Sequence, residues 1–179
     1  CLSWLCAQTH IRCVLPLFVF FSGYQLYLHS FPTRRSADLD GDANFIACHQ
    51  PIFLERYPML DKAADNAVFL LNTSLEADDI WASLPKNMQQ QIIDKHIKLY
   101  CIDAYDIAAK TGMDQRINTI MQTCFFSISG VLPADEAIKA IKDAVQKTYG
   151  RKGKRLVELN FKAIDETLAN LHKITIPNK

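Results

Sequence analysis

The clearest pattern in the chain lies in residues 114–133, where apolar side chains recur with the spacing of one helix face. The members of this stripe are Ile117, Ile120, Met121, Cys124, Phe125 and Ile128. Positions separated by three, four, seven or eight residues share one side of an α-helix, so the stripe predicts a helix with one face in the core. The opposite face carries amides and hydroxyls: Asn118, Thr119, Gln122, Thr123, Ser127 and Ser129.

This polar face is notable because no charged residue lies between Arg116 and Asp135. Amides and hydroxyls cost less to desolvate than lysine or glutamate when they find hydrogen-bond partners, so such a face suits contact with another protein layer or a ligand. The alternative is an ordinary buried helix whose polar side is partly covered by loops. Both interpretations remain open at this point.

Upstream of this helix, short apolar runs alternate with helical segments. Strands are predicted at residues 43–48, 67–71 and 97–102. The intervening helices are predicted at 53–64 with a break near Pro58, at 78–85, at 88–96 and at 104–110. Downstream we expect helices at 133–150 and 156–171 and an extended tail at 172–177. Strands that alternate with helices predict an α/β domain with a mostly parallel sheet and a helical C-terminal half.

Three polar residues follow directly on the predicted strands or end them: His49, Asn72 and Asp103. Ligands of open parallel sheets bind at the carboxyl ends of the strands, so this edge is where chemistry would gather. Each residue also has a structural interpretation. His49 would be a loop hydrogen-bonder, Asn72 a turn former, and Asp103 the N-cap of the helix at 104–110.

Composition places the chain among globular proteins and excludes several function classes. The 179 residues are 49% hydrophobic and carry a formal net charge of +1, which provides no attraction to nucleic acid or to a membrane surface. The six cysteines form no CxxC pair, so neither a zinc ribbon nor a ferredoxin-type cluster is predicted within this chain. Cys48, Cys101 and Cys124 are interpreted as reduced thiols that fill apolar positions.

Motifs of a self-contained active site do not occur: GxGxxG, GxxxxGK[ST], GxSxG and HExxH are all missing. The basic loop at residues 149–155 (YGRKGKR) could hold a phosphate or an acidic partner, or could be a solvated turn between helices. Arg116 is placed in the first turn of the predicted helix at 114–133, where the positive dipole end favours an anion. Its partner would be a phosphorylated cofactor or a carboxylate across a domain interface.

Residues 1–40 differ in character from the rest. The apolar run at 14–21 is too short for a membrane helix and is followed by no small-residue cleavage site. Residues 29–39, HSFPTRRSADL, resemble the in-frame translation of a common short-read sequencing adapter and differ from HSFPTRRSSDL only at Ala37, a single base change. We therefore expect residues 1–40 to be an assembly artefact, with a signal peptide or membrane anchor as the alternative.

A family resemblance covers nearly all of the remaining chain, residues 41–177. The strings RINTIMQTCFF (116–126) and TYGRKGK (148–154) are specific, and ANFIACHQPIFLERYPML, FLLNTS and KLYCIDAYDIA fit the same domain. Together they resemble the gamma-type domain of pyruvate:ferredoxin (flavodoxin) oxidoreductase. The long single-chain form is a closer match than the separate gamma subunits of related 2-oxoacid:ferredoxin oxidoreductases, which remain an alternative.

The resemblance implies a Rossmann-like three-layer domain of a cytoplasmic homodimeric enzyme. Such an enzyme decarboxylates pyruvate oxidatively with coenzyme A to acetyl-CoA and reduces ferredoxin or flavodoxin. Thiamine diphosphate and the [4Fe-4S] clusters belong to its other domains, and neither nucleic acid nor a membrane is an expected partner. This isolated fragment would be inactive.

The family's gamma-type domain begins further upstream than residue 41, so the resemblance also implies an incomplete sheet with an exposed edge. For the site it implies that Arg116 contacts a coenzyme A phosphate, with Asn118 and Gln122 as weaker candidates; no catalytic or metal residue is predicted. The competing hypothesis is a free-standing α/β docking module without catalysis.

Overall fold

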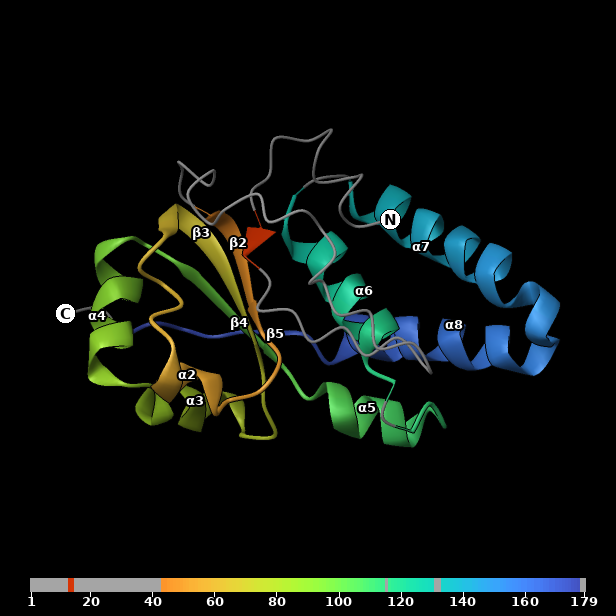
Figure 1. Cartoon of the computed structure of the whole chain (residues 1–179), viewed down its shortest axis with the longest axis horizontal. Helices are drawn as coiled ribbons and strands as arrows, with labels where there is room; N and C mark the ends of the chain where they lie inside the picture. The colour runs from red at the N-terminus through yellow and green to blue at the C-terminus, as the bar shows by residue number, and fades with distance from the viewer. Residues whose placement is uncertain (1–12, 15–42, 115, 131–132, 178–179) are drawn as a thin grey trace, which may run out of the picture.

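The computed structural model describes residues 13–14, 43–114, 116–130 and 133–177. Within these ranges the chain forms three layers, with a sheet between two groups of helices (Figure 1). This arrangement confirms the predicted α/β class. The predicted boundary between residues 40 and 41 lies outside the described residues.

In the described part of the chain, the sheet has five strands in the order β1-β2-β3-β4-β5. Their bounds are Cys13–Val14 for β1, Ala43–Cys48 for β2, Ala63–Asn72 for β3, Lys98–Ile102 for β4 and His172–Lys173 for β5. Strands β1 to β4 pair in parallel and β5 pairs with β4 antiparallel, so the prediction of a mostly parallel sheet is confirmed. On the β2 side lies the sheet edge that was predicted to be open. Among the described residues, the two residues of β1 pair with it.

Each central strand sends alternate side chains to opposite faces, because successive residues of a strand point in opposite directions. In β3, Phe69 and Leu71 face one core, and Val68 and Leu70 face the other. All four are buried, which explains why this strand reads as a continuous apolar run in the sequence.

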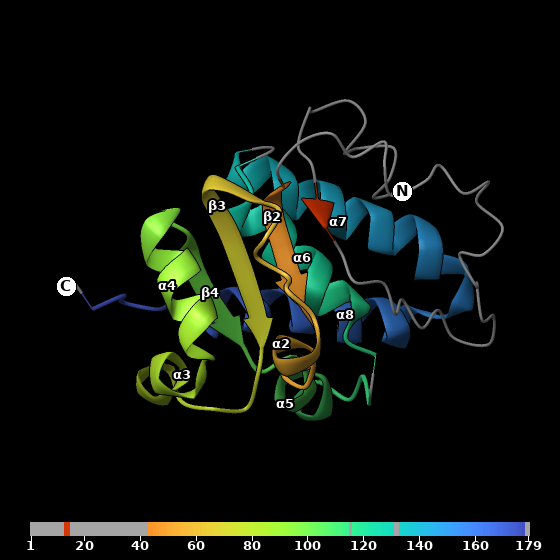
Figure 2. The ribbon, with the colours of Figure 1, turned by 60° about the vertical axis from the view of Figure 1, so that its left-hand side comes forward.

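The first face is covered by α2 (Phe53–Arg56), α3 (Ala77–Ser83) and α4 (Lys86–Asp94). The second face is covered by α5 (Ala104–Lys110), α6 (Asn118–Ile128), α7 (Ala134–Tyr149) and α8 (Lys154–Ala169), with η2 (Gly150–Lys152) joining the last two. Figure 2 shows α3 and α4 on one side of the strands and α6, α7 and α8 on the other. Within the described ranges, no helix is both long enough and apolar enough to cross a membrane.

The helix predicted at residues 53–64 is wrong over its second half. Helix α2 ends at Arg56, because Tyr57 takes an extended conformation before Pro58, as the residue before a proline generally does. Strand β3 then begins at Ala63, earlier than predicted, and its register with β2 is irregular near this end. Asn66 lies there with φ 61°, a conformation that asparagine adopts more readily than most residues.

Helix α6 is buried on more sides than its apolar stripe predicts. Thr119 and Thr123, both on the polar face, are buried inside this chain. The Thr119 hydroxyl donates to Asn160 Oδ1 of α8 at 2.8 Å, and the Thr123 hydroxyl donates to the Thr119 carbonyl at 2.7 Å. Asn118, Gln122, Ser127 and Ser129 are partly exposed. The uncharged face is therefore covered in part by α8, and no second domain is needed to explain those two threonines.

Replacing the Thr119 hydroxyl should destabilise the domain measurably. Thr119→Val leaves the buried Asn160 Oδ1 without this donor, and we expect the free energy of unfolding to fall by about 1–2 kcal/mol. Urea unfolding followed by circular dichroism measures the change. The double variant Thr119→Val/Asn160→Leu should lose less than the sum of the single variants, and strict additivity would contradict a direct interaction.

Candidate functional site

The carboxyl ends of the three central strands are joined by the side chain of Asn72. This last residue of β3 is 2% exposed. Its Nδ2 donates to the His49 carbonyl at 3.0 Å, and its Oδ1 accepts from the Ala104 backbone N–H at 2.9 Å. Asn72 thus connects the loop after β2 with the start of α5. The sequence predicted Asn72 as a turn former and missed this connecting role, although an asparagine that ends an apolar strand run was a usable signal.

His49 and Asp103 lie on either side of the connection made by Asn72. Asp103 is the N-cap of α5, because its carboxylate accepts from the Asp106 backbone N–H at 2.9 Å. Desolvation lowers the pKa of His49, so burial favours its neutral form. The structure brings His49, Asn72 and Asp103 to one edge, as the sequence predicted, and it engages Asn72 and Asp103 in holding the backbone.

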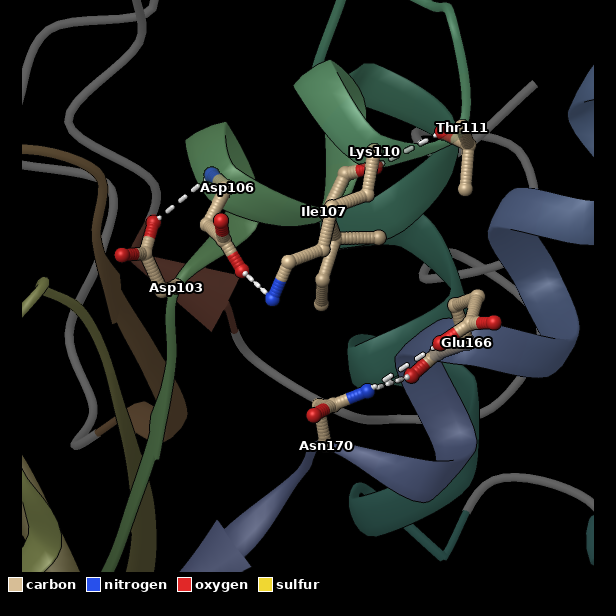
Figure 3. A network of polar contacts seen from close by, with 7 residues as sticks. All are labelled: Asp103, Asp106, Ile107, Lys110, Thr111, Glu166 and Asn170. Atoms are coloured by element: carbon tan, nitrogen blue, oxygen red, sulfur yellow. Dashed lines mark hydrogen bonds and ion pairs between the residues drawn. The ribbon is translucent and has the colours of Figure 1, made fainter.

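Helix α5 carries an ion pair on its exposed side. Figure 3 shows Lys110 pointing toward Asp106, one turn earlier on the same helix. The hydrogen bond and charge of Asp106 raise the pKa of Lys110, with smaller contributions from Glu166 and Asp103. Both partners are exposed to solvent, so this pair contributes little to stability.

Arg116 lies just before α6, outside the helix itself. The helix begins at Asn118 with Ile117 as N-cap, so the prediction that Arg116 sits in its first turn is wrong by two positions. The cause is local backbone geometry: Asp114 has φ 54°, which is not helical, and the Arg116 backbone N–H bonds to the Met113 carbonyl. The chain therefore turns here before it becomes a helix.

The Arg116 side chain is about half exposed and has weak local partners. Its Nε donates to the Met113 carbonyl at 3.1 Å, and its Nη2 lies 3.8 Å from the Asp114 carboxylate. A solvated ion pair of this length contributes between nothing and about 1 kcal/mol. An incoming phosphate could replace Asp114 at small cost, so the geometry leaves the guanidinium available to an anion.

Asn118 and Gln122 are separated by one turn, so they share a face of α6 near Arg116. Both are partly exposed. Figures 1 and 2 both show α6 starting on the side of the molecule where α2, α3 and α5 lie, which is the side of the strands' carboxyl ends. The three predicted contact residues therefore lie on the ligand-binding side typical of such sheets.

The basic loop at residues 149–155 lies elsewhere. It forms η2 and the start of α8 at the turn between α7 and α8, and in both views this turn is at the end of the molecule away from the sheet. Lys152 lies over the Tyr149 ring, with its Nζ 5.7 Å from the ring centroid. The basic side chains of this loop are exposed, as expected of a solvated turn. The loop is not part of the carboxyl-edge site.

The thiols of the described chain lie in two separate cores of the domain. Cys48 and Cys101 lie in β2 and β4, each paired with Leu71 of the intervening strand, and Cys124 lies in the other core. Burial raises the pKa of Cys48 and of Cys101 to about 11 and raises that of Cys124 further, so all three are neutral thiols at pH 7. Across the described residues, no group of three or more histidines, cysteines or acidic residues is placed to hold a metal ion.

Fold and site together define a class: a three-layer α/β domain with a mostly parallel sheet, whose carboxyl edge is braced by the side chains of Asn72 and Asp103. The model of the pyruvate ferredoxin/flavodoxin oxidoreductase family matches residues 29–169. The chain belongs to this family. The match begins within the adapter-like stretch at 29–39.

Curated relatives agree with this assignment. The chain is 51% identical over 142 residues to a putative pyruvate-flavodoxin oxidoreductase of Synechocystis and 51% identical over 143 residues to the pyruvate-flavodoxin oxidoreductase of Rhodospirillum rubrum. It is 45% identical over 143 residues to the pyruvate:ferredoxin oxidoreductase of Moorella thermoacetica. These alignments cover 79–80% of this chain but 12% of each relative, so the chain corresponds to a small part of those proteins.

A solved structure has the same fold. Pyruvate oxidoreductase subunit PORC of Thermotoga maritima superposes with a TM-score of 0.57 at 16% identity, over 74% of this chain and 65% of that one. At this identity the likeness concerns the fold alone.

Proposed function

We propose that this chain is the gamma-type domain of an oxidoreductase that converts pyruvate and coenzyme A into acetyl-CoA and carbon dioxide and passes the electrons to ferredoxin or flavodoxin. In that enzyme, the domain acts as a scaffold and as a wall on the coenzyme A side. The observation that carries the proposal is the match at about half identity along most of the chain to pyruvate-flavodoxin oxidoreductases.

The described residues favour a structural role of the domain over a catalytic one. Asn72 and Asp103 at the carboxyl edge brace the backbone, and the buried thiols are divided between two separate cores. Thiamine diphosphate and [4Fe-4S] clusters would then be held by the remainder of the parent polypeptide, which we place in the cytoplasm as a homodimer. The isolated chain would have no oxidoreductase activity.

For coenzyme A, the proposal assigns Arg116 as the phosphate contact, with Asn118 and Gln122 as weaker contacts. Coenzyme A supplies the thiol that accepts the acetyl group and carries the phosphates that a protein can recognise. Arg116 fits because its guanidinium is half exposed and its present ion pair is weak. Asn118 and Gln122 add uncharged donors one helical turn apart, and such groups bind phosphate oxygens without adding charge.

We expect Arg116→Ala in the full-length parent enzyme to raise the apparent KM for coenzyme A by about tenfold, with little change in the KM for pyruvate. The estimate follows from losing one charge-assisted hydrogen bond at a partly solvated site, about 1.5 kcal/mol. Steady-state reduction of flavodoxin measures both constants.

The matched control is Lys139→Ala, which removes an exposed cation from α7 and should leave both constants within twofold. An equal rise in both KM values for Arg116→Ala, or no rise, would contradict the phosphate role. Failure of the parent to oxidise pyruvate at all would contradict the proposed function itself.

The native gene separates this proposal from a free-standing docking module. Amplifying the locus from source DNA should reveal an open reading frame that continues into the thiamine and cluster domains and that does not encode residues 1–40 as printed. A short gene that encodes residues 1–179 in frame, without those domains, would favour the docking module and would contradict the assembly artefact.

A further inference from the structure

The exposed large hydrophobic side chains of the described residues gather on one side of the molecule. They are Ile52, Tyr57, Leu75 and Tyr105, which are 44%, 57%, 46% and 44% exposed. Single exposed apolar residues are ordinary, but these four all lie in the segments that follow the carboxyl ends of β2, β3 and β4. We name this set the carboxyl-edge patch.

The segments that carry the patch are held against one another by specific hydrogen bonds. Asn72 links the His49 carbonyl to the Ala104 backbone, and the Thr73 backbone N–H donates to the Ile102 carbonyl at 2.9 Å. The Leu75 N–H donates to the Thr73 hydroxyl at 3.2 Å. Figures 1 and 2 both show α2, α3 and α5 gathered along the same edge of the sheet. The patch is thus presented on braced backbone, which reduces the entropy lost when a partner binds.

The surroundings of the patch are acidic. Segments 49–57, 73–79 and 103–106 carry six acidic side chains and one basic side chain, Arg56; the acidic ones are Glu55, Glu76, Asp78, Asp79, Asp103 and Asp106. Lys110 of α5 pairs with Asp106, so the other five acidic side chains set the charge around the patch. Three of the six, Asp78, Asp79 and Asp106, also lie in the first turns of α3 and α5, where negative charge stabilises a helix. These side chains stabilise their helices, and the acidic side chains other than Asp106 also make the surface around the patch negative. A partner with basic groups around an apolar centre would therefore be complementary.

We propose that the carboxyl-edge patch docks against another segment of the same parent polypeptide, which presents apolar side chains surrounded by lysine or arginine. This inference rests on the proposed function. The matched relatives extend far beyond this chain, which spans 12% of their length, so most of such a polypeptide is available as the occupant. Burial of the four side chains would provide the hydrophobic core of an interdomain interface.

Two other occupants fit the chemistry less well. The acidic side chains around the patch, here called the acidic rim, would repel the negative charge of a phosphorylated ligand. A second copy of this chain in a two-fold contact through the same patch would bring two acidic rims together, because an isologous interface pairs each surface with itself. Coenzyme A and self-association are therefore poor candidates for this patch, although Arg116 nearby remains suited to phosphate.

The test places the photo-crosslinking residue p-benzoylphenylalanine at Leu75 of the full-length parent enzyme, with Tyr105 as a second position and exposed Ala144 of α7 as control. After irradiation, we expect an intrachain crosslink at both patch positions to a peptide outside residues 41–177, at a yield at least fivefold above that of the control. Mass spectrometry of the digest identifies the peptide.

A crosslinked product of doubled mass would identify a second copy as the occupant and would overturn the inference. Crosslinking that occurs only when flavodoxin or ferredoxin is added, or a yield no higher than that of Ala144, would overturn it as well. In each case, flavodoxin reduction by the same preparation reports separately on the proposed function. An active enzyme with an uncrosslinked patch refutes the docking alone.

Discussion

Phe125→Ala should lower the free energy of unfolding of this chain by about 3–5 kcal/mol, the cost typical of truncating a large aromatic side chain in a packed core. Phe125 is 5% exposed and lies at the contact between α6 and the sheet. Its ring packs edge-on against Phe45 of β2 at 4.8 Å and against Phe126 at 5.1 Å. The truncation removes both ring contacts and leaves a cavity that the rigid sheet cannot close.

Urea unfolding monitored by circular dichroism measures this loss. Phe125→Leu retains most of the volume and should cost about 1 kcal/mol. The matched control is Phe161→Ala in α8, since Phe161 is only partly buried and has Lys142 over its ring at 5.7 Å. Equal losses for Phe125→Ala and Phe161→Ala would contradict the placement of Phe125 at the centre of this core.

Asn72→Ala should cost about 2–4 kcal/mol, although it removes only a small polar side chain. The variant leaves the buried Ala104 N–H and the half-buried His49 carbonyl without their partner. A buried unsatisfied group costs about 1–3 kcal/mol, and a half-buried one costs less. Amide hydrogen exchange provides a site-specific readout. The Ala104 amide should exchange faster in the variant, because its bond to Asn72 Oδ1 is lost.

The control for this variant is Asn170→Ala at the end of α8. Asn170 also donates from its side-chain nitrogen to a backbone carbonyl, that of Glu166 at 2.8 Å, but it is exposed, so water replaces the bond and the loss should stay below about 0.5 kcal/mol. A similarly small effect of Asn72→Ala, with unchanged exchange at Ala104, would show that the three strand ends hold their positions without this side chain.

Both predictions concern how the functional side of the domain is built. Phe125 fixes α6 against the sheet, and this helix carries Asn118 and Gln122, with Arg116 in the turn just before it. Asn72 fixes the segments that carry the carboxyl-edge patch. The roles proposed above, a wall and a docking surface, would depend on such positioning, because each requires surface residues to be held in a fixed place.

Periodicity alone located most of the elements. The strand predicted at 43–48 matches β2, and the helix predicted at 104–110 matches α5 with Asp103 as its cap. These segments were predictable because their signals are local: a bounded apolar run, and a capping side chain three residues from the amide it binds. The end of α2 at Arg56 and the early start of β3 were harder to predict from the sequence. For β3, the reason is that pairing with β2 decides where the strand begins.

The site was predictable only as a set of residue types. The sequence placed His49, Asn72 and Asp103 at strand ends, which is a consequence of chain order in a parallel sheet. It did not reveal that Asn72 bonds to both neighbouring segments, because those partners are 23 and 32 residues away. It also placed Arg116 inside a helix, whereas the turn at Asp114 delays the helix to Asn118.

By itself, the sequence determined the α/β class, the apolar stripe of α6 and the family, since each of these is written in local spacing or in specific strings. Only the tertiary structure decided what faces the polar side of α6. The uncharged face that suggested a second protein layer or a ligand meets α8 of the same chain at Thr119, and Thr123 on that face is also buried. The exposed apolar surface lies instead at the carboxyl edge, because folding brings together Ile52, Leu75 and Tyr105 from segments that are distant in the chain.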